Sequence, residues 1–115
     1  MKKLSDCWSL FRFENGGRGE GLYIIEGVYV GRSRAVVSRV KEHVLKATKN
    51  RHDNKALQKV ILDAISKKGF VSCEYLDLPV TDDNEKKIID KLQSKGVNTV
   101  NKKSNSQYEH RARYR

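Results

Sequence analysis

Five side chains in this sequence have the chemistry that hydrolysis of a phosphodiester bond requires: Tyr23, Tyr29, Arg39, His43 and Glu85. Such hydrolysis needs a nucleophilic water, stabilisation of the charge that develops on the phosphate, and help for the leaving oxygen. Arg39 offers a planar fork of donors to phosphate oxygens and cannot lose its charge. Glu85 offers a hard oxygen ligand for Mg²⁺, which keeps most of its waters and needs few protein carboxylates.

The two tyrosines and the histidine could orient or deprotonate the water. A phenol, with its usual pKa of about 10, is a poor base unless a cation such as Arg39 or a metal lowers that pKa. Whether Tyr23 or His43 takes the proton stays open. Each residue also has a purely structural interpretation, and for Glu85 this is a capping box with Asp82. Because Glu85 lies on the apolar stripe of its helix, we expect it to point inward.

The tyrosines can act together only if they lie on one face of a sheet. Residues 22–30 have the pattern of a β-hairpin around Glu26-Gly27. A two-residue loop would place Tyr23 and Tyr29 on opposite faces, whereas a three-residue loop of residues 25–27 would place them directly across from each other. Gly27 suits the left-handed position of the longer loop. We therefore predict the three-residue loop, with both phenols on one face.

Three amphipathic helices are predicted after the hairpin. The first runs from Arg34 to about Lys49 with Ser33 as its N-cap, and it carries Arg39 and His43 four residues apart on one side. The second begins at Asp53 or Asn54 and ends at Gly69. A strand over residues 70–76 follows, and a third helix opens near residues 81–85 and ends at Gly96.

The predicted fold is an α/β (α+β) sandwich, in which three helices flank a small, three-stranded, mainly antiparallel sheet in the order β-β-α-α-β-α. Residues 1–20 form an N-terminal arm and a glycine-rich loop, residues 21–101 the domain, and residues 102–115 a basic tail.

In this order the residues resemble a GIY-YIG nuclease domain. Gly21-Leu22-Tyr23 and Tyr29-Val30-Gly31 stand for the two signature triplets, with leucine and valine in place of isoleucines. The helix motifs of the family are matched by the following residues: Ser33, Val36, Arg39 and His43; Asn54, Leu57 and Gln58; and Glu85 with Ile88, Ile89 and Asn98. The hairpin is shorter than the family usually has, and no appended DNA-binding domain follows.

The resemblance implies a metal-dependent DNA endonuclease with one Mg²⁺ or Mn²⁺ ion at Glu85. It implies Tyr23 as the general base, with His43 and Tyr29 as supporting hydrogen-bonding groups. One active site per chain would nick one strand, so a double-strand break would need a homodimer or successive nicks. The small size and the missing specificity domain suggest a phage or mobile element.

The charge of the chain favours a polyanionic partner. Lys and Arg number 24 against 14 Asp and Glu, a formal charge of +10, and nucleic acid is the usual partner of such an excess because each phosphate contact releases a counterion. The candidate DNA-binding residues are Arg32, Arg34, Lys46, Lys102, Lys103, Arg111, Arg113 and Arg115. The basic tail could equally be a solvated chain end. The rival function is a non-catalytic nucleic-acid-binding module with the same fold.

The cellular compartment is expected to be the cytoplasm. No apolar run approaches the roughly 18 residues of a spanning helix, and Asp6 and Ser9 interrupt the N-terminal apolar residues, so no signal peptide is expected. Cys7 and Cys73 are far apart in sequence, which suits a reducing compartment better than a disulfide framework.

Overall fold

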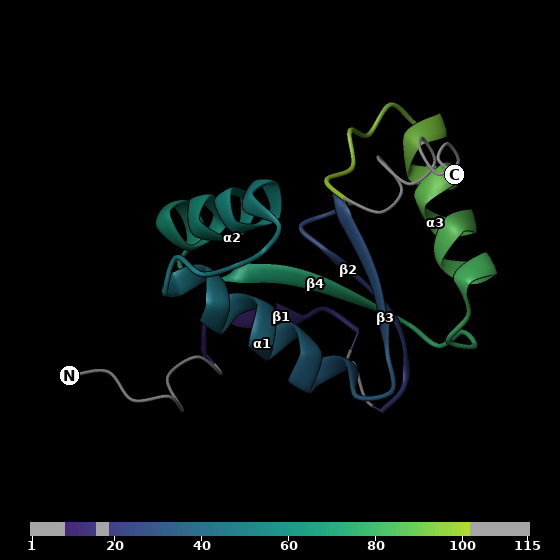
Figure 1. The fold of residues 1–115 in the computed structure, drawn as a ribbon, viewed down its shortest axis with the longest axis horizontal. Helices are drawn as coiled ribbons and strands as arrows, with labels where there is room; N and C mark the ends of the chain where they lie inside the picture. The colour runs from purple at the N-terminus through teal and green to yellow at the C-terminus, as the bar shows by residue number, and fades with distance from the viewer. Residues whose placement is uncertain (1–8, 16–18, 102–115) are drawn as a thin grey trace.

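The fold is an α+β domain in which one sheet lies between two layers of helices (Figure 1). The computed structural model describes residues 9–15 and 19–101. Within them the elements are β1 (Phe11–Phe13), β2 (Gly21–Ile25), β3 (Tyr29–Ser33), α1 (Val36–Thr48), α2 (Lys55–Lys68), β4 (Val71–Leu76) and α3 (Asp82–Ser94). The strands are arranged in the order β1-β4-β2-β3, with β1 parallel to β4 and the other pairs antiparallel. No helix in this part of the chain is long and apolar enough to cross a membrane.

The predicted three-stranded sheet is wrong by one strand, because β1 adds a fourth. This strand lies in the stretch that was predicted to be an arm, and the order of elements is therefore β-β-β-α-α-β-α. Phe11 is buried in the core beneath α1. Three residues are too few for a period-2 pattern to be recognised, and the partner of β1 is β4, about sixty residues further along.

The two faces of the sheet build two hydrophobic clusters. Tyr23 and Ile25 of β2 pack with α1 and α2, and Leu22 and Ile24 of the same strand pack with α3. All five residues of β2 are buried. Helices thus cover both faces of this strand, which explains its continuous run of apolar residues. A strand buried on one face only would alternate apolar and polar residues.

The hairpin between β2 and β3 has the predicted loop length but a different position. Residues 26–28 form the loop, and Ile25 pairs with Tyr29. Glu26 and Gly27 both have positive φ, at 49° and 72°. The Glu26 carboxylate accepts hydrogen bonds from the Ser72 amide and the Lys68 ammonium, each at 2.7 Å. These contacts hold a non-glycine residue in a left-handed conformation, which local turn preferences did not favour.

The shifted loop changes which residue lies opposite Tyr23. Gly31 takes that place, so the predicted direct pair of Tyr23 and Tyr29 is wrong. The shift is two residues, however, and side chains two apart on a strand share a face. The two rings therefore do lie on one side, with centroids 6.3 Å apart. The predicted shared face is confirmed.

The helix ends follow their local signals with one exception. Asn54 caps α2 by accepting from the Leu57 amide at 3.0 Å, and Gly69 ends that helix with φ 87°. Ser33 does not cap α1. Its hydroxyl accepts from the Ala35 amide at 2.9 Å in a turn before the helix, which begins at Val36.

The third helix is capped by Thr81, whose hydroxyl accepts from the Asn84 amide at 3.1 Å. Asp82 is the first residue of α3 rather than its cap. The alternative role of Glu85 in a capping box with Asp82 is therefore excluded, and its carboxylate serves another contact.

Candidate active site

An aromatic cluster on the α1 side of the sheet contains three of the predicted residues. The Tyr23 hydroxyl lies 2.8 Å from Nε2 of His43, and the His43 ring meets the Tyr29 ring edge-on at 5.4 Å between centroids. Tyr23 and His43 are 1% and 7% exposed. Two strands and one helix thus bring these side chains into contact.

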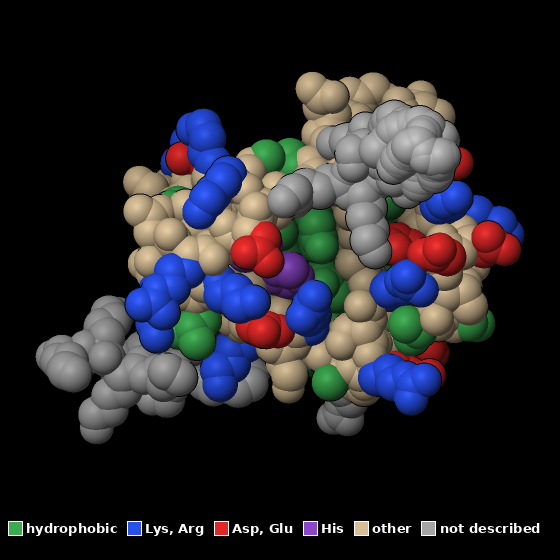
Figure 2. All heavy atoms as spheres, in the orientation of Figure 1, with side chains coloured by type: hydrophobic (Ala, Val, Ile, Leu, Met, Phe, Trp, Pro, Cys, Tyr) green, Lys and Arg blue, Asp and Glu red, His purple; other side chains and the backbone are tan. Residues whose placement is uncertain are grey.

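Arg39 lies one turn before His43 on α1, at the surface of this cluster. Its side chain is 50% exposed and pairs with Glu42 at 3.0 Å. It also lies close enough to the Tyr23 hydroxyl to affect the pKa of that group. A histidine on this face of the molecule has Lys and Arg side chains on either side of it, with Asp or Glu side chains next to it (Figure 2). An anion arriving from solvent would therefore meet Arg39 before it met the buried hydroxyl.

His52 is a buried member of the site that sequence analysis did not identify. Its Nε2 lies 2.7 Å from Nδ1 of His43, and its Nδ1 accepts from the Asn54 amide at 2.9 Å. Its own amide donates to the Gln58 side chain at 2.9 Å. His52 follows α1 in a short polar stretch, between the first and second predicted helices. Such a stretch has no periodicity from which burial could be inferred.

The pKa values of the histidines are lowered. Burial is the main cause for both, and it lowers the pKa of His43 to about 3, with the neighbouring His52 adding to the effect. For His52, burial is followed by the positive charge of Lys46. Both rings are therefore neutral near pH 7.

The pKa values of the tyrosines are raised, so Arg39 does not give either phenol the lowered pKa that a phenolic base would need. For Tyr23, burial and the neighbouring Tyr29 outweigh the opposing effect of Arg39. For Tyr29, burial and the Glu85 carboxylate raise the pKa. Both phenols are therefore protonated near pH 7, because desolvation costs a phenolate more than one half-exposed guanidinium returns.

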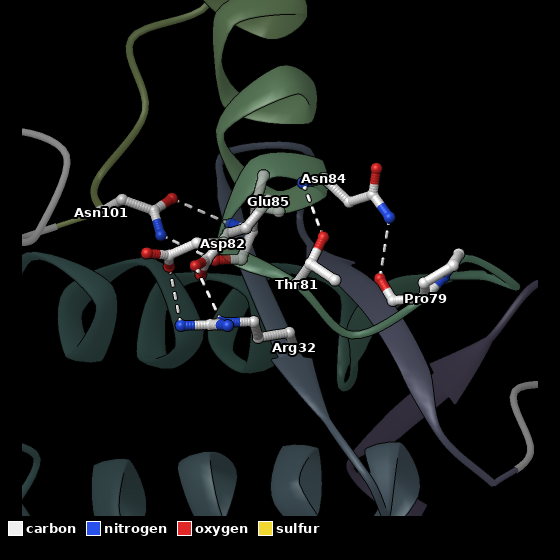
Figure 3. Close-up of polar contacts among 8 residues, drawn as sticks. Arg32, Pro79, Thr81, Asp82, Asn84, Glu85 and Asn101 are labelled. Atoms are coloured by element: carbon white, nitrogen blue, oxygen red, sulfur yellow. Dashed lines mark hydrogen bonds and ion pairs between the residues drawn. The ribbon is translucent and has the colours of Figure 1, made fainter.

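Glu85 approaches this cluster from the other side of the edge strand β3. Its side chain is 17% exposed, and its Oε1 lies 3.2 Å from Nε of Arg32. Nη2 of the same arginine lies 2.7 Å from Oδ1 of Asp82. Figure 3 shows the guanidinium pointing at the first turn of α3, between these two carboxylates. Glu85 thus points inward, as predicted.

The candidate DNA-binding residues have different environments. Arg32 is engaged by the two carboxylates of α3, Arg34 is exposed, and Lys46 is 47% exposed and lies 3.5 Å from Glu42. The remaining candidates, Lys102, Lys103, Arg111, Arg113 and Arg115, lie outside the described residues.

Asn101 is a second residue that sequence analysis missed. Its side chain accepts from the Val30 amide at 2.9 Å and donates to the Val30 carbonyl at 2.6 Å. Asn101 is 4% exposed, whereas Asn98, the residue that carried the resemblance, is exposed. Asn101 thus provides β3 with the backbone partner that an edge strand otherwise lacks.

The donor set around Glu85 fits a metal site with few protein ligands. Among the described residues, no group of three or more His, Cys, Asp or Glu side chains could hold a metal ion. Mg²⁺ does not require one, since it commonly uses one or two carboxylates together with waters and substrate phosphates. Glu85 and Asp82 already bind one cationic group, because both carboxylates pair with the guanidinium of Arg32.

Comparison with models of protein families, with curated proteins and with solved structures gave no match to this chain. The resemblance to GIY-YIG nucleases rests on the residues and spacings given above.

Proposed function

We propose that this chain is a metal-dependent DNA endonuclease that hydrolyses phosphodiester bonds and nicks one strand per active site. One observation supports this most: the Tyr23 hydroxyl, the His43 ring and the Arg39 guanidinium meet on one face of the sheet, although they come from two separate elements. A nucleic-acid-binding surface needs positive charge, but it does not need a buried and hydrogen-bonded phenol and imidazole beneath that charge.

Arg39 holds the scissile phosphate in this proposal. It is charged at any relevant pH, and it is exposed enough to exchange its partner Glu42 for two phosphate oxygens. The tyrosine hydroxyls orient the attacking water, and His43 supports Tyr23 through the hydrogen bond to its hydroxyl. All of them act as neutral hydrogen-bonding groups, because burial disfavours both the phenolate and the imidazolium.

Glu85, with Asp82 beside it, holds one Mg²⁺ or Mn²⁺ ion in this proposal. A bound divalent ion stabilises negative charge on the phosphate and lowers the pKa of water. Arg32 is paired with both carboxylates, so it must yield its contact with Glu85 when the ion binds. The arginine is thereby a competitor of the metal as well as a candidate contact to DNA.

DNA is the proposed substrate because the whole chain carries a formal charge of +10, and Lys and Arg side chains lie on this face (Figure 2). Arg34 and Lys46 are the described candidates for backbone contacts outside the reacting centre. Contacts of this kind are independent of sequence and weaken as salt increases. A second copy of the chain would be needed to cut both strands at once. We place this activity in the cytoplasm, in agreement with the free, buried thiol of Cys73.

The test is incubation of the full-length protein with supercoiled plasmid and Mg²⁺ at low salt. We expect conversion to open circles, which EDTA abolishes. Arg39→Ala and Glu85→Ala should each slow nicking by about a hundredfold or more. Lys59→Ala on the exposed side of α2 and Glu74→Ala, an exposed glutamate of β4, are the matched controls and should nick normally.

A plasmid that stays closed while its mobility on a native gel is shifted would overturn the nuclease proposal in favour of a non-catalytic binding module. If neither nicking nor a shift occurs at low salt, nucleic acid is the wrong partner. If the control variants lose activity as strongly as Arg39→Ala and Glu85→Ala, the assigned site is wrong.

A further inference from the structure

The backbone amide of Asn54 starts a chain of hydrogen bonds that ends at Tyr23. Asn54 N–H lies 2.9 Å from Nδ1 of His52. Nε2 of His52 lies 2.7 Å from Nδ1 of His43. Nε2 of His43 lies 2.8 Å from the Tyr23 hydroxyl. The two imidazole rings are almost parallel, with 17° between their planes.

A backbone amide can only donate, and this fixes every proton in the chain. Nδ1 of His52 must offer a lone pair to Asn54, so the proton of the neutral ring is on Nε2. That proton is donated to Nδ1 of His43, which must therefore also be unprotonated. The proton of His43 is then on its Nε2 and is donated to the oxygen of Tyr23. A second proton on either ring would place two donors face to face.

We propose that His52 is a positioning residue of this site, which holds His43 as a hydrogen-bond donor to Tyr23 and thereby directs the Tyr23 proton away from His43. The inference rests on the proposed function for its catalytic meaning, and on the three hydrogen bonds for its geometry. Because both nitrogens of His43 are engaged, this ring has no lone pair for a water. His43 is thus excluded as the general base, and hydrogen bonding to the water falls to the phenols.

The direction of the Tyr23 proton follows from its neighbours. His43 donates to the Tyr23 oxygen, and Arg39 can only donate. The hydroxyl proton therefore points to the side on which Tyr29 lies, toward the Tyr29 hydroxyl or toward a bound water or phosphate. Without His52, the His43 ring could take the other tautomer, accept the Tyr23 proton, and leave the substrate side without that donor.

The loop around His52 is built to hold this ring in one place. Gln58 accepts from the His52 amide, and the Gln58 side-chain nitrogen donates to Asn50 at 2.6 Å. Asn54 is itself fixed, since its side chain caps α2 and donates to the Val100 carbonyl at 2.8 Å. The lowered pKa of both histidines agrees with two neutral rings in this buried series of hydrogen bonds.

The experiment is long-range ¹H–¹⁵N NMR of the histidine rings in the full-length protein at pH 7, without DNA. The sequence has three histidines, and single His→Gln variants assign their signals. We expect His43 and His52 both to be neutral, with the proton on Nε2. A proton on Nδ1 of either ring, or a cationic His43, would overturn the inference whether or not the protein cuts DNA. If the expected tautomers are found in a protein that does not nick plasmid, the nuclease proposal fails and the hydrogen-bond chain stands.

Two variants test the positioning role itself. His52→Leu removes the donor to His43 and should slow nicking by about 10- to 100-fold, as loss of an orienting partner does at metal sites. His52→Gln keeps an N–H at the place of Nε2, and it should restore most of the activity and the Nε2–H signal of His43. If both variants lose activity in proportion to their loss of stability while the His43 tautomer is unchanged, His52 has only a structural role.

Discussion

Replacing Gly31 with alanine should disable the site while leaving the fold in place. Gly31 lies directly across from Tyr23 in the β2–β3 ladder, and the phenol extends over it. A Cβ built on Gly31 would overlap Cζ and the hydroxyl oxygen of Tyr23 and lie 2.7 Å from Cε1. The position of the Tyr23 ring thus requires a glycine at residue 31.

The size of the effect follows from this overlap. Carbon atoms in ordinary contact are separated by about 3.5–4.0 Å, so the Tyr23 ring must move by about 1 Å or more. The hydroxyl, at 2.8 Å from His43, cannot follow that movement and keep its hydrogen bond. A displacement of about 1 Å in a catalytic group can cost about a hundredfold in rate. Overpacking the core should also cost about 1–3 kcal/mol in the free energy of unfolding.

Plasmid nicking and urea denaturation, measured side by side, separate the two effects. Gly21→Ala is the matched control in the same strand as Tyr23, since its Cβ would meet the Leu76 carbonyl at 2.6 Å and Cε1 of Tyr75 at 2.9 Å, and the atoms nearest to it do not belong to Tyr23. Gly21→Ala should lose stability and keep its rate per folded molecule, whereas Gly31→Ala should lose both. Wild-type nicking by folded Gly31→Ala would refute this reasoning, because the Tyr23 hydroxyl would then not need its present position.

Three further outcomes are expected. Arg32→Gln should lower the Mg²⁺ concentration that gives half-maximal nicking at saturating DNA by up to about fivefold, because a partly exposed ion pair contributes about 0.2–1 kcal/mol. An unchanged or higher Mg²⁺ requirement would show that Arg32 does not compete with the metal. Asn101→Ala should lower the free energy of unfolding in urea by about 1–3 kcal/mol, because it leaves two buried backbone groups of Val30 without partners, whereas exposed Asn98→Ala should change it by less than about 0.5 kcal/mol. The pKa of His43 is lowered from 6.5 to about 3, so between these values the unfolded chain binds a proton that the folded chain does not. The free energy of unfolding should therefore decrease as the pH is lowered across this window, by up to about 1.4 kcal/mol per pH unit. A His43→Gln variant should show a shallower slope.

The parts of the fold that could be predicted are those specified by neighbouring residues. The cap at Asn54 depends on its side chain accepting from the Leu57 amide, and the end of α2 depends on the Gly69 amide donating to the Ile65 carbonyl. In each bond the two partners are at most four residues apart in the sequence. The strand β1 could not be predicted, because it has a parallel partner far along the chain. The loop position at Glu26 failed for a similar reason, since Lys68 and Ser72 support its left-handed conformation from another part of the chain.

The same distinction applies to the site. Strand parity was enough to place Tyr23 and Tyr29 on one face, and helical spacing was enough to bring His43 near them. His52 and Asn101 lie in loops, where burial depends on tertiary contacts that no local pattern reports. Arg32 was predicted to bind phosphate because its charge is evident in sequence, whereas its two carboxylate partners lie fifty or more residues away.

The edge strand β3 couples the two halves of the site. Its alternation sends Tyr29 to the side of His43 and sends Arg32 to the side of Glu85. Asn101 fixes the strand from outside by binding both backbone groups of Val30, between these two side chains. The side of the sheet that carries His43 and the side that carries Glu85 are thus joined through a few residues of one strand, and not through a mobile loop. The length of the hairpin loop is critical for this reason. With one residue fewer, every side chain of β3 would point to the opposite face of the sheet. Tyr29 would then lie on the side of α3, and Arg32 would lie on the side of His43.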